Sequence, residues 1–110
     1  MTWINLPHKR AINWKNDLNK RIRVTYEQRI NGSYERFRID FSFNNRTKTL
    51  DVVEVWDKDV SEEVYSIIEN ETSEYKCLPM NIETLSLIAR KIIKDLDKMP
   101  DIRYTSMNMI

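Results

Sequence analysis

The sequence RIRVTYEQRINGSYERFRIDFSF, residues 21–43, decides the fold because apolar and polar side chains alternate along both halves of it. Asn31-Gly32 stands between the two halves and favours a type I′ turn, since both central positions of that turn need a positive φ. We therefore predict a two-residue β-hairpin whose register brings apolar residues opposite apolar residues. The predicted apolar pairs are Ile22 with Phe41, Val24 with Ile39, and Tyr26 with Phe37.

The polar side of this predicted hairpin is rich in arginine. Two arginines have predicted acidic partners on the facing strand, Arg23 with Asp40 and Arg36 with Glu27. A guanidinium group donates paired hydrogen bonds to phosphate or carboxylate, and a nearby aromatic ring can stack on a base. A solvated sheet face also needs polar residues, so an ordinary surface is the alternative. The candidate binding residues that pairing does not explain are Arg21, Arg29, Ile30, Tyr34 and Arg38.

The hairpin tip is a separate candidate site. Ile30 and Tyr34 lie beyond the last predicted apolar pair, so we expect them to be exposed at the end of a projecting finger. Such a pair can anchor a protein in a pocket of its partner. The alternative is an ordinary turn without a binding role.

Charge is distributed unevenly along a chain whose net charge is only +1. Residues 8–48 contain eleven Lys and Arg against four acids, which gives +7, and residues 51–74 contain nine acids against one Lys, which gives −8. Such asymmetry is typical of surfaces that bind nucleic acid or charged proteins. Alternatively, the two segments neutralise each other within the fold.

After the hairpin, residues 44–48 predict a second turn and the next residues a third antiparallel strand. A change of phase at Val52-Val53 indicates either a β-bulge or a strand that is buried on both sides. Asp59 and Glu62 have the spacing of a capping box and predict a short helix after them. The alternative for this segment is a strand over residues 64–69 paired with residues 75–78, but the apolar spacing favours the helix.

Residues 82–98 predict the longest helix, between Asn81 and Pro100, with a wide apolar stripe on one side. On its opposite side Arg90 and Lys94 flank Leu87, which is a second candidate contact surface. Residues 100–110 are either an edge strand or disordered.

These elements predict a single domain over the 110 residues. An irregular segment (1–19) precedes a core (20–99), and the fold class is α+β. A three- to four-stranded antiparallel meander packs against one long C-terminal helix, with a short helix before it. If that helix covers one side of the sheet, the arginine-rich side is left for a partner.

No pattern in the sequence indicates catalysis, a metal site or a cofactor. His8 is the only histidine, and Cys77 is the only cysteine, which excludes an internal disulfide and favours a reducing compartment. Asp51 with Glu74 and Lys76 resembles the spacing of a metal-dependent nuclease only weakly, since acidic and basic residues are frequent in this chain. No apolar run is long enough to cross a membrane.

We therefore expect a non-enzymatic binding protein that modulates or inhibits a protein that handles nucleic acid. The many Ile, Asn and Lys codons indicate an AT-rich gene, which fits a phage or mobile element and the cytoplasm of a bacterial host. An anti-defence factor of the anti-CRISPR kind belongs to this function class. The alternative is a protein that binds DNA or RNA directly through the arginine-rich side of the hairpin. The sequence carries no signal for an oligomeric state.

Overall fold

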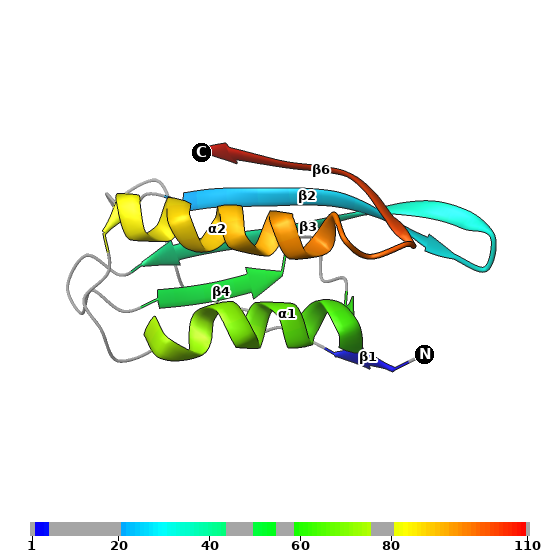
Figure 1. Ribbon diagram of the computed structural model, residues 1–110, viewed down its shortest axis with the longest axis horizontal. Helices are drawn as coiled ribbons and strands as arrows, with labels where there is room; N and C mark the ends of the chain where they lie inside the picture. The colour runs from blue at the N-terminus through cyan, green and yellow to red at the C-terminus, as the bar shows by residue number, and fades with distance from the viewer. Residues whose placement is uncertain (1, 5–20, 44–49, 55–58, 76–80, 110) are drawn as a thin grey trace.

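The computed structural model describes residues 2–4, 21–43, 50–54, 59–75 and 81–109, with the backbone alone described for residues 21, 42–43 and 50–54. Its fold is α+β, as predicted, with an antiparallel sheet in the order β4-β3-β2-β6 and both helices on one side of that sheet (Figure 1). A further two-stranded ribbon joins β1 to β5. The elements are β1 (Trp3–Ile4), β2 (Arg21–Ile30), β3 (Ser33–Phe43), β4 (Leu50–Glu54), β5 (Val60–Ser61), α1 (Glu62–Thr72), a 3-10 turn (Ser73–Tyr75), α2 (Ile82–Leu96) and β6 (Ile102–Met109).

The predicted hairpin is confirmed in every pair of its register. Asn31 and Gly32 have φ values of 51° and 85°, which is the left-handed conformation that a type I′ turn requires. Ile22 lies opposite Phe41 and Arg23 lies opposite Asp40, so the apolar and polar sides separate as the alternation predicts. The hairpin extends past the ends of both helices at one end of the molecule (Figure 1).

The hydrophobic core lies between the sheet and the two helices. Tyr26 and Phe37 form a stacked pair within it, with ring centroids 5.2 Å apart. Burial raises the pKa of the Tyr26 hydroxyl, because the ionised form is poorly solvated there. The buried apolar side chains are Ile22, Val24, Tyr26, Phe37, Ile39, Phe41, Val60, Val64, Ile68, Leu85, Ile88, Ala89, Ile92, Leu96 and Ile102.

Helix α2 begins where the sequence predicts it but ends earlier. Asn81 caps it, since the Asn81 side-chain oxygen accepts a hydrogen bond of 2.8 Å from the Thr84 amide. The helix ends at Leu96 and not at residue 98, because Lys98 and Met99 bond to the carbonyls three residues back, and Pro100 has no N–H group to continue the helix. The chain then returns as β6, so of the two alternatives for residues 100–110 the edge strand is confirmed, and the long helix is not the last element of the fold.

Helix α1 is present as predicted, but its cap is not Asp59. The Ser61 hydroxyl accepts a hydrogen bond from the Val64 amide and caps the helix. Residues Val60–Ser61 are extended because they pair with Trp3–Ile4, so the helix begins only after them. This pairing also corrects the prediction of a wholly irregular N-terminal segment. Residues 5–20 lie outside the described part of the chain.

Strand β4 pairs with β3 in a continuous register from Leu50 to Glu54. The predicted third antiparallel strand is therefore confirmed, and of the two alternatives for the change of phase at Val52-Val53 the β-bulge is wrong. The predicted turn before this strand, residues 44–48, lies outside the described residues.

Candidate binding face

The side of the sheet that faces away from α2 carries most of the polar side chains of the three strands β3, β2 and β6, and we call it the arginine face. Five arginines and two acids give its described residues a net charge of +3. On β2 and β3, strand alternation places these side chains on one side because their neighbours in sequence are buried. The residues of the arginine face are Arg23, Thr25, Glu27 and Arg29 on β2, Tyr34, Arg36, Arg38 and Asp40 on β3, and Arg103, Tyr104, Ser106 and Asn108 on β6.

The register orders these residues in rows across the sheet. In the central row Thr25 lies between Arg38 on one side and Ser106 on the other. Short hydroxyl side chains at the centre and long side chains around them leave a hollow. One flanking row consists of Asp40, Arg23 and Asn108. The other consists of Arg36, Glu27 and Arg103.

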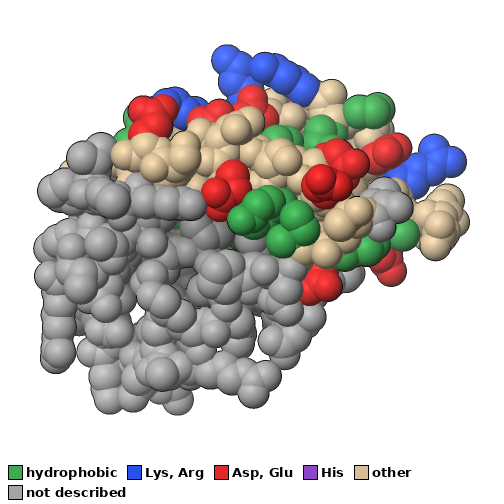
Figure 2. All heavy atoms as spheres, turned by 90° about the horizontal axis from the view of Figure 1, so that it is seen from below, with side chains coloured by type: hydrophobic (Ala, Val, Ile, Leu, Met, Phe, Trp, Pro, Cys, Tyr) green, Lys and Arg blue, Asp and Glu red, His purple; other side chains and the backbone are tan. Residues whose placement is uncertain are grey.

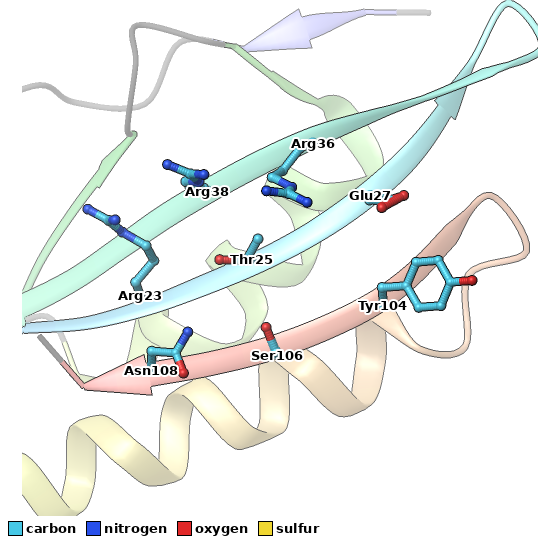
Figure 3. A pocket seen from close by; sticks show the side chains of 8 residues that line it. All are labelled: Arg23, Thr25, Glu27, Arg36, Arg38, Tyr104, Ser106 and Asn108. Carbon is cyan, nitrogen blue, oxygen red and sulfur yellow. The ribbon is translucent and has the colours of Figure 1, made fainter.

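This hollow is a polar pocket of about 420 Å³ (Figure 3). Three guanidinium groups and several hydroxyl and amide groups surround it, so donors of hydrogen bonds predominate. Such a lining suits an anionic group, because arginine donates paired, charge-assisted hydrogen bonds to phosphate or carboxylate oxygens. The lining residues are Arg23, Thr25, Glu27, Arg36, Arg38, Tyr104, Ser106 and Asn108.

Two ion pairs hold side chains of the arginine face in place. Arg23 Nε lies 2.9 Å from Asp40 Oδ1, and Arg23 Nη2 donates a second, longer bond of 3.4 Å to Asp40 Oδ2. Asp40 is buried, so this pair fixes the Arg23 guanidinium at the edge of the pocket. Glu27 accepts a bond of 3.3 Å from Arg103 Nε, an arginine that sequence reasoning did not include in the site.

The hairpin tip differs from the predicted finger with two exposed anchors. Ile30 is half-buried and packs against the core, so it does not stand free for a partner pocket. The ring of Tyr34 is covered on one side by the Arg103 guanidinium, whose central carbon lies 3.4 Å from the ring centroid. The tip is therefore joined to β6.

The remaining predicted site residues fall into two groups that the fold separates. Arg29 and Arg38 belong to the arginine face, and Arg21 opens β2 opposite Ser42. Leu87, which is 46% exposed, lies on α2 on the other side of the sheet, as do the exposed Arg90 and Lys94. One partner surface of modest size therefore contacts one group or the other.

Sequence reasoning missed the contribution of β6 to the pocket. Tyr104, Ser106 and Asn108 all line it, although the tail gave only an ambiguous strand signal. The reasoning also set Arg23 and Arg36 aside as paired residues, and both line the pocket. The alternating Ser106 and Asn108 were the one available signal that this strand has a polar side.

Helix α1 gives the molecule a second charged surface, of opposite sign. Glu62 and Glu63 are exposed on α1, Glu74 is exposed on the 3-10 turn that follows it, and α1 itself contains no basic residue. Figure 2 shows acidic side chains spread over the described part of this face, with basic side chains at its upper border and at the hairpin end. Because α1 lies on the helix side of the sheet and the arginine face lies on the other side, the acidic and arginine-rich surfaces of the described residues are distinct (Figure 1 and Figure 3).

Among the described residues, no group of three or more His, Cys, Asp or Glu side chains is placed to hold a metal ion. Within the same residues, no helix is long and apolar enough to cross a membrane. Lys76 of the weak nuclease pattern lies outside them.

The chain was compared with models of protein families, with curated proteins and with solved structures, and none of the three comparisons finds a match.

Proposed function

We propose that this protein is a non-enzymatic binding protein that holds a nucleic-acid strand on its arginine face. The observation that carries the proposal is the pocket in which Arg23, Arg36 and Arg38 surround a floor of hydroxyl and amide groups. A nucleic-acid strand carries negatively charged phosphates at regular spacing along its backbone. The arginine face has a net charge of +3 and so attracts such a strand.

The shape of the face supports a strand as the occupant. Each of its polar rows contains an arginine and the rows follow one another along the strands, so a backbone that runs along the strands meets one arginine after another. Thr25, Ser106 and Asn108 add neutral donors between the arginines, and such groups contact phosphates and sugars without reading sequence. We therefore expect binding with little sequence preference.

The test is fluorescence anisotropy of labelled DNA and RNA oligonucleotides, titrated with the protein at about 50 mM salt, where electrostatic affinity is high. Saturable binding that weakens as salt is raised is the expected result. The absence of binding to every oligonucleotide at this salt concentration overturns the proposal.

A second candidate function is the one expected from the sequence, inhibition or modulation of a protein that handles nucleic acid. The exposed acids of α1 favour it, because spaced carboxylates can occupy a basic groove that normally holds phosphates. A phage- or mobile-element factor acting in a bacterial cytoplasm fits this function. Its test is capture of a nucleic-acid-handling protein from bacterial lysate, with Glu62→Ala plus Glu63→Ala as the variant that loses the partner. If the capture is equal for that variant and for the wild type, this second function is wrong.

A further inference from the structure

At the hairpin end of the arginine face, two tyrosines and an arginine form a cluster. The Arg103 guanidinium lies 3.4 Å from the centroid of the Tyr34 ring and 4.8 Å from that of Tyr104. Its bond to Glu27 fixes it from a third direction. Both rings therefore contact the same guanidinium group, while Tyr104 remains 71% exposed.

The position of Tyr104 results from an irregularity in β6. The register between β2 and β6 shifts between Thr25 and Glu27, so that β6 contains more residues than β2 over this stretch. A β-bulge of this kind re-aims side chains, and here Arg103 and Tyr104 both reach the arginine face although they are adjacent in sequence.

Tyr104 has a φ of 54°, in the left-handed region that non-glycine residues rarely adopt. The fold keeps a strained backbone at a residue whose side chain contributes little to the core. Such strain at an exposed aromatic residue beside a polar pocket is typical of a functional position. Packing in the core does not account for the strain, because Tyr104 is mostly exposed and is not part of the core.

We propose that the Tyr104 ring is a platform on which an unpaired base of the bound strand stacks, so that the arginine face selects single-stranded nucleic acid. This inference rests on the proposed function and specifies its substrate. Every base presents a π face, and stacking on an aromatic ring needs no particular sequence. In a duplex the bases are already stacked and paired, so the ring gains no such contact.

The neighbouring groups suit the backbone of the same strand. Tyr104 lines the same pocket as Arg36 and Arg38, at the end nearer the hairpin tip (Figure 3). A base on the ring therefore places the adjoining phosphates over the arginines. Arg103, stacked against the ring and joined to Glu27, keeps the platform in place before the strand arrives.

The experiment compares three labelled ligands of equal length, about 12 nucleotides, which is within the usual site size of single-strand-binding proteins. They are a single-stranded oligonucleotide, a duplex, and a single strand of abasic sugar-phosphate units. Each is titrated with the wild type, with Tyr104→Ala and with Tyr104→Phe. Met109→Ala is the matched control, because it removes an exposed apolar side chain from the same strand, at a position that pairs with the buried Ile22 and so lies off the arginine face.

We expect the wild type to bind the single strand more tightly than the duplex or the abasic strand. Tyr104→Ala should weaken single-strand binding about 5- to 150-fold, the range measured for loss of one stacked base, and leave abasic binding unchanged. Tyr104→Phe should retain most of the affinity, since it keeps the ring. Thermal unfolding of each variant shows whether a loss of affinity reflects a loss of fold.

The outcomes separate this inference from the proposed function. Equal binding of all three ligands, unaffected by Tyr104→Ala, overturns the stacking platform and leaves phosphate binding by the arginine face intact. Failure to bind any of the three overturns both. Tight binding of the duplex with weak binding of the single strand also overturns the platform.

Discussion

The arginines of the arginine face lead to a quantitative prediction of how the affinity for a nucleic-acid strand depends on salt concentration. Each phosphate that a protein neutralises on a single strand releases counterions and adds about −0.7 to the slope of log affinity against log salt. Five arginines occupy the face, which sets an upper limit of about −3.5 for that slope. If Glu27 and Asp40 cancel two of the five charges, the slope is about −2.1. Raising salt from about 50 to about 200 mM then weakens binding roughly 20- to 130-fold.

The perturbation is the double variant Arg36→Ala plus Arg38→Ala, which removes two cations from one strand of the pocket. The slope should become less steep by about 1.4, because two phosphate contacts are lost. Arg36 is exposed and Arg38 is half-buried, and neither belongs to the apolar core, so we expect the variant to fold. The assay is anisotropy of a labelled single strand at four or more salt concentrations.

The matched control is Arg90→Ala plus Lys94→Ala, which removes the same charge from the exposed side of α2. Since these residues lie on the other side of the sheet, the slope should stay at the wild-type value. An unchanged slope for the pocket variant, or an equal change in both variants, refutes binding at the arginine face.

Three further predictions concern stability. Burial raises the pKa of Glu71, and so do its hydrogen bond with Asp95 and the repulsion between these two carboxylates, whereas Lys91 lowers it. The folded state therefore binds a proton at Glu71 more readily than the unfolded state does. Stability should therefore fall as pH rises from about 4.5, the ordinary value, through the raised pKa, and Glu71→Gln should raise the melting temperature at pH 7 but not below about pH 4; an equal effect at both pH values contradicts this. Ser61→Ala removes both the α1 cap and a buried hydrogen bond of 3.2 Å with Gln28, and should cost about 1–3 kcal/mol in urea unfolding; a loss below about 0.5 kcal/mol refutes the reasoning. Tyr104→Asn suits the left-handed backbone and should raise stability by up to about 1 kcal/mol while lowering single-strand affinity; a destabilised variant shows that the tyrosine ring supports the fold.

The last of these predictions contains a trade-off between stability and binding. A residue that is kept for packing loses stability when it is replaced, whereas a residue that is kept for binding can gain it. Tyr104 is suited to this comparison because its side chain is mostly exposed and its backbone is strained. The opposite signs expected for stability and affinity therefore distinguish a functional tyrosine from a structural one.

The hairpin could be predicted from the sequence by itself because all its determinants are local. Asn31-Gly32 sets the turn, the turn sets the register, and the alternation of side chains sets the two sides. The beginning of α2 is equally local, since it depends on the Asn81 cap and on the apolar stripe. The arginine-rich side followed from the same alternation.

Only the tertiary structure decided which strand would complete the binding face. Residues 102–109 join β2 across most of the length of the chain, and nothing near them in sequence marks that partner. The bulge that brings Tyr104 to the pocket exists only in that pairing, because a bulge is defined by one strand having an extra residue relative to the strand it pairs with. Ser61 likewise replaced Asp59 as the cap of α1 because a distant strand, Trp3–Ile4, holds the intervening residues extended. The local turn and the alternation of side chains determined the side of the sheet on which the hairpin arginines lie. Long-range pairing with β6 decided which residues surround them.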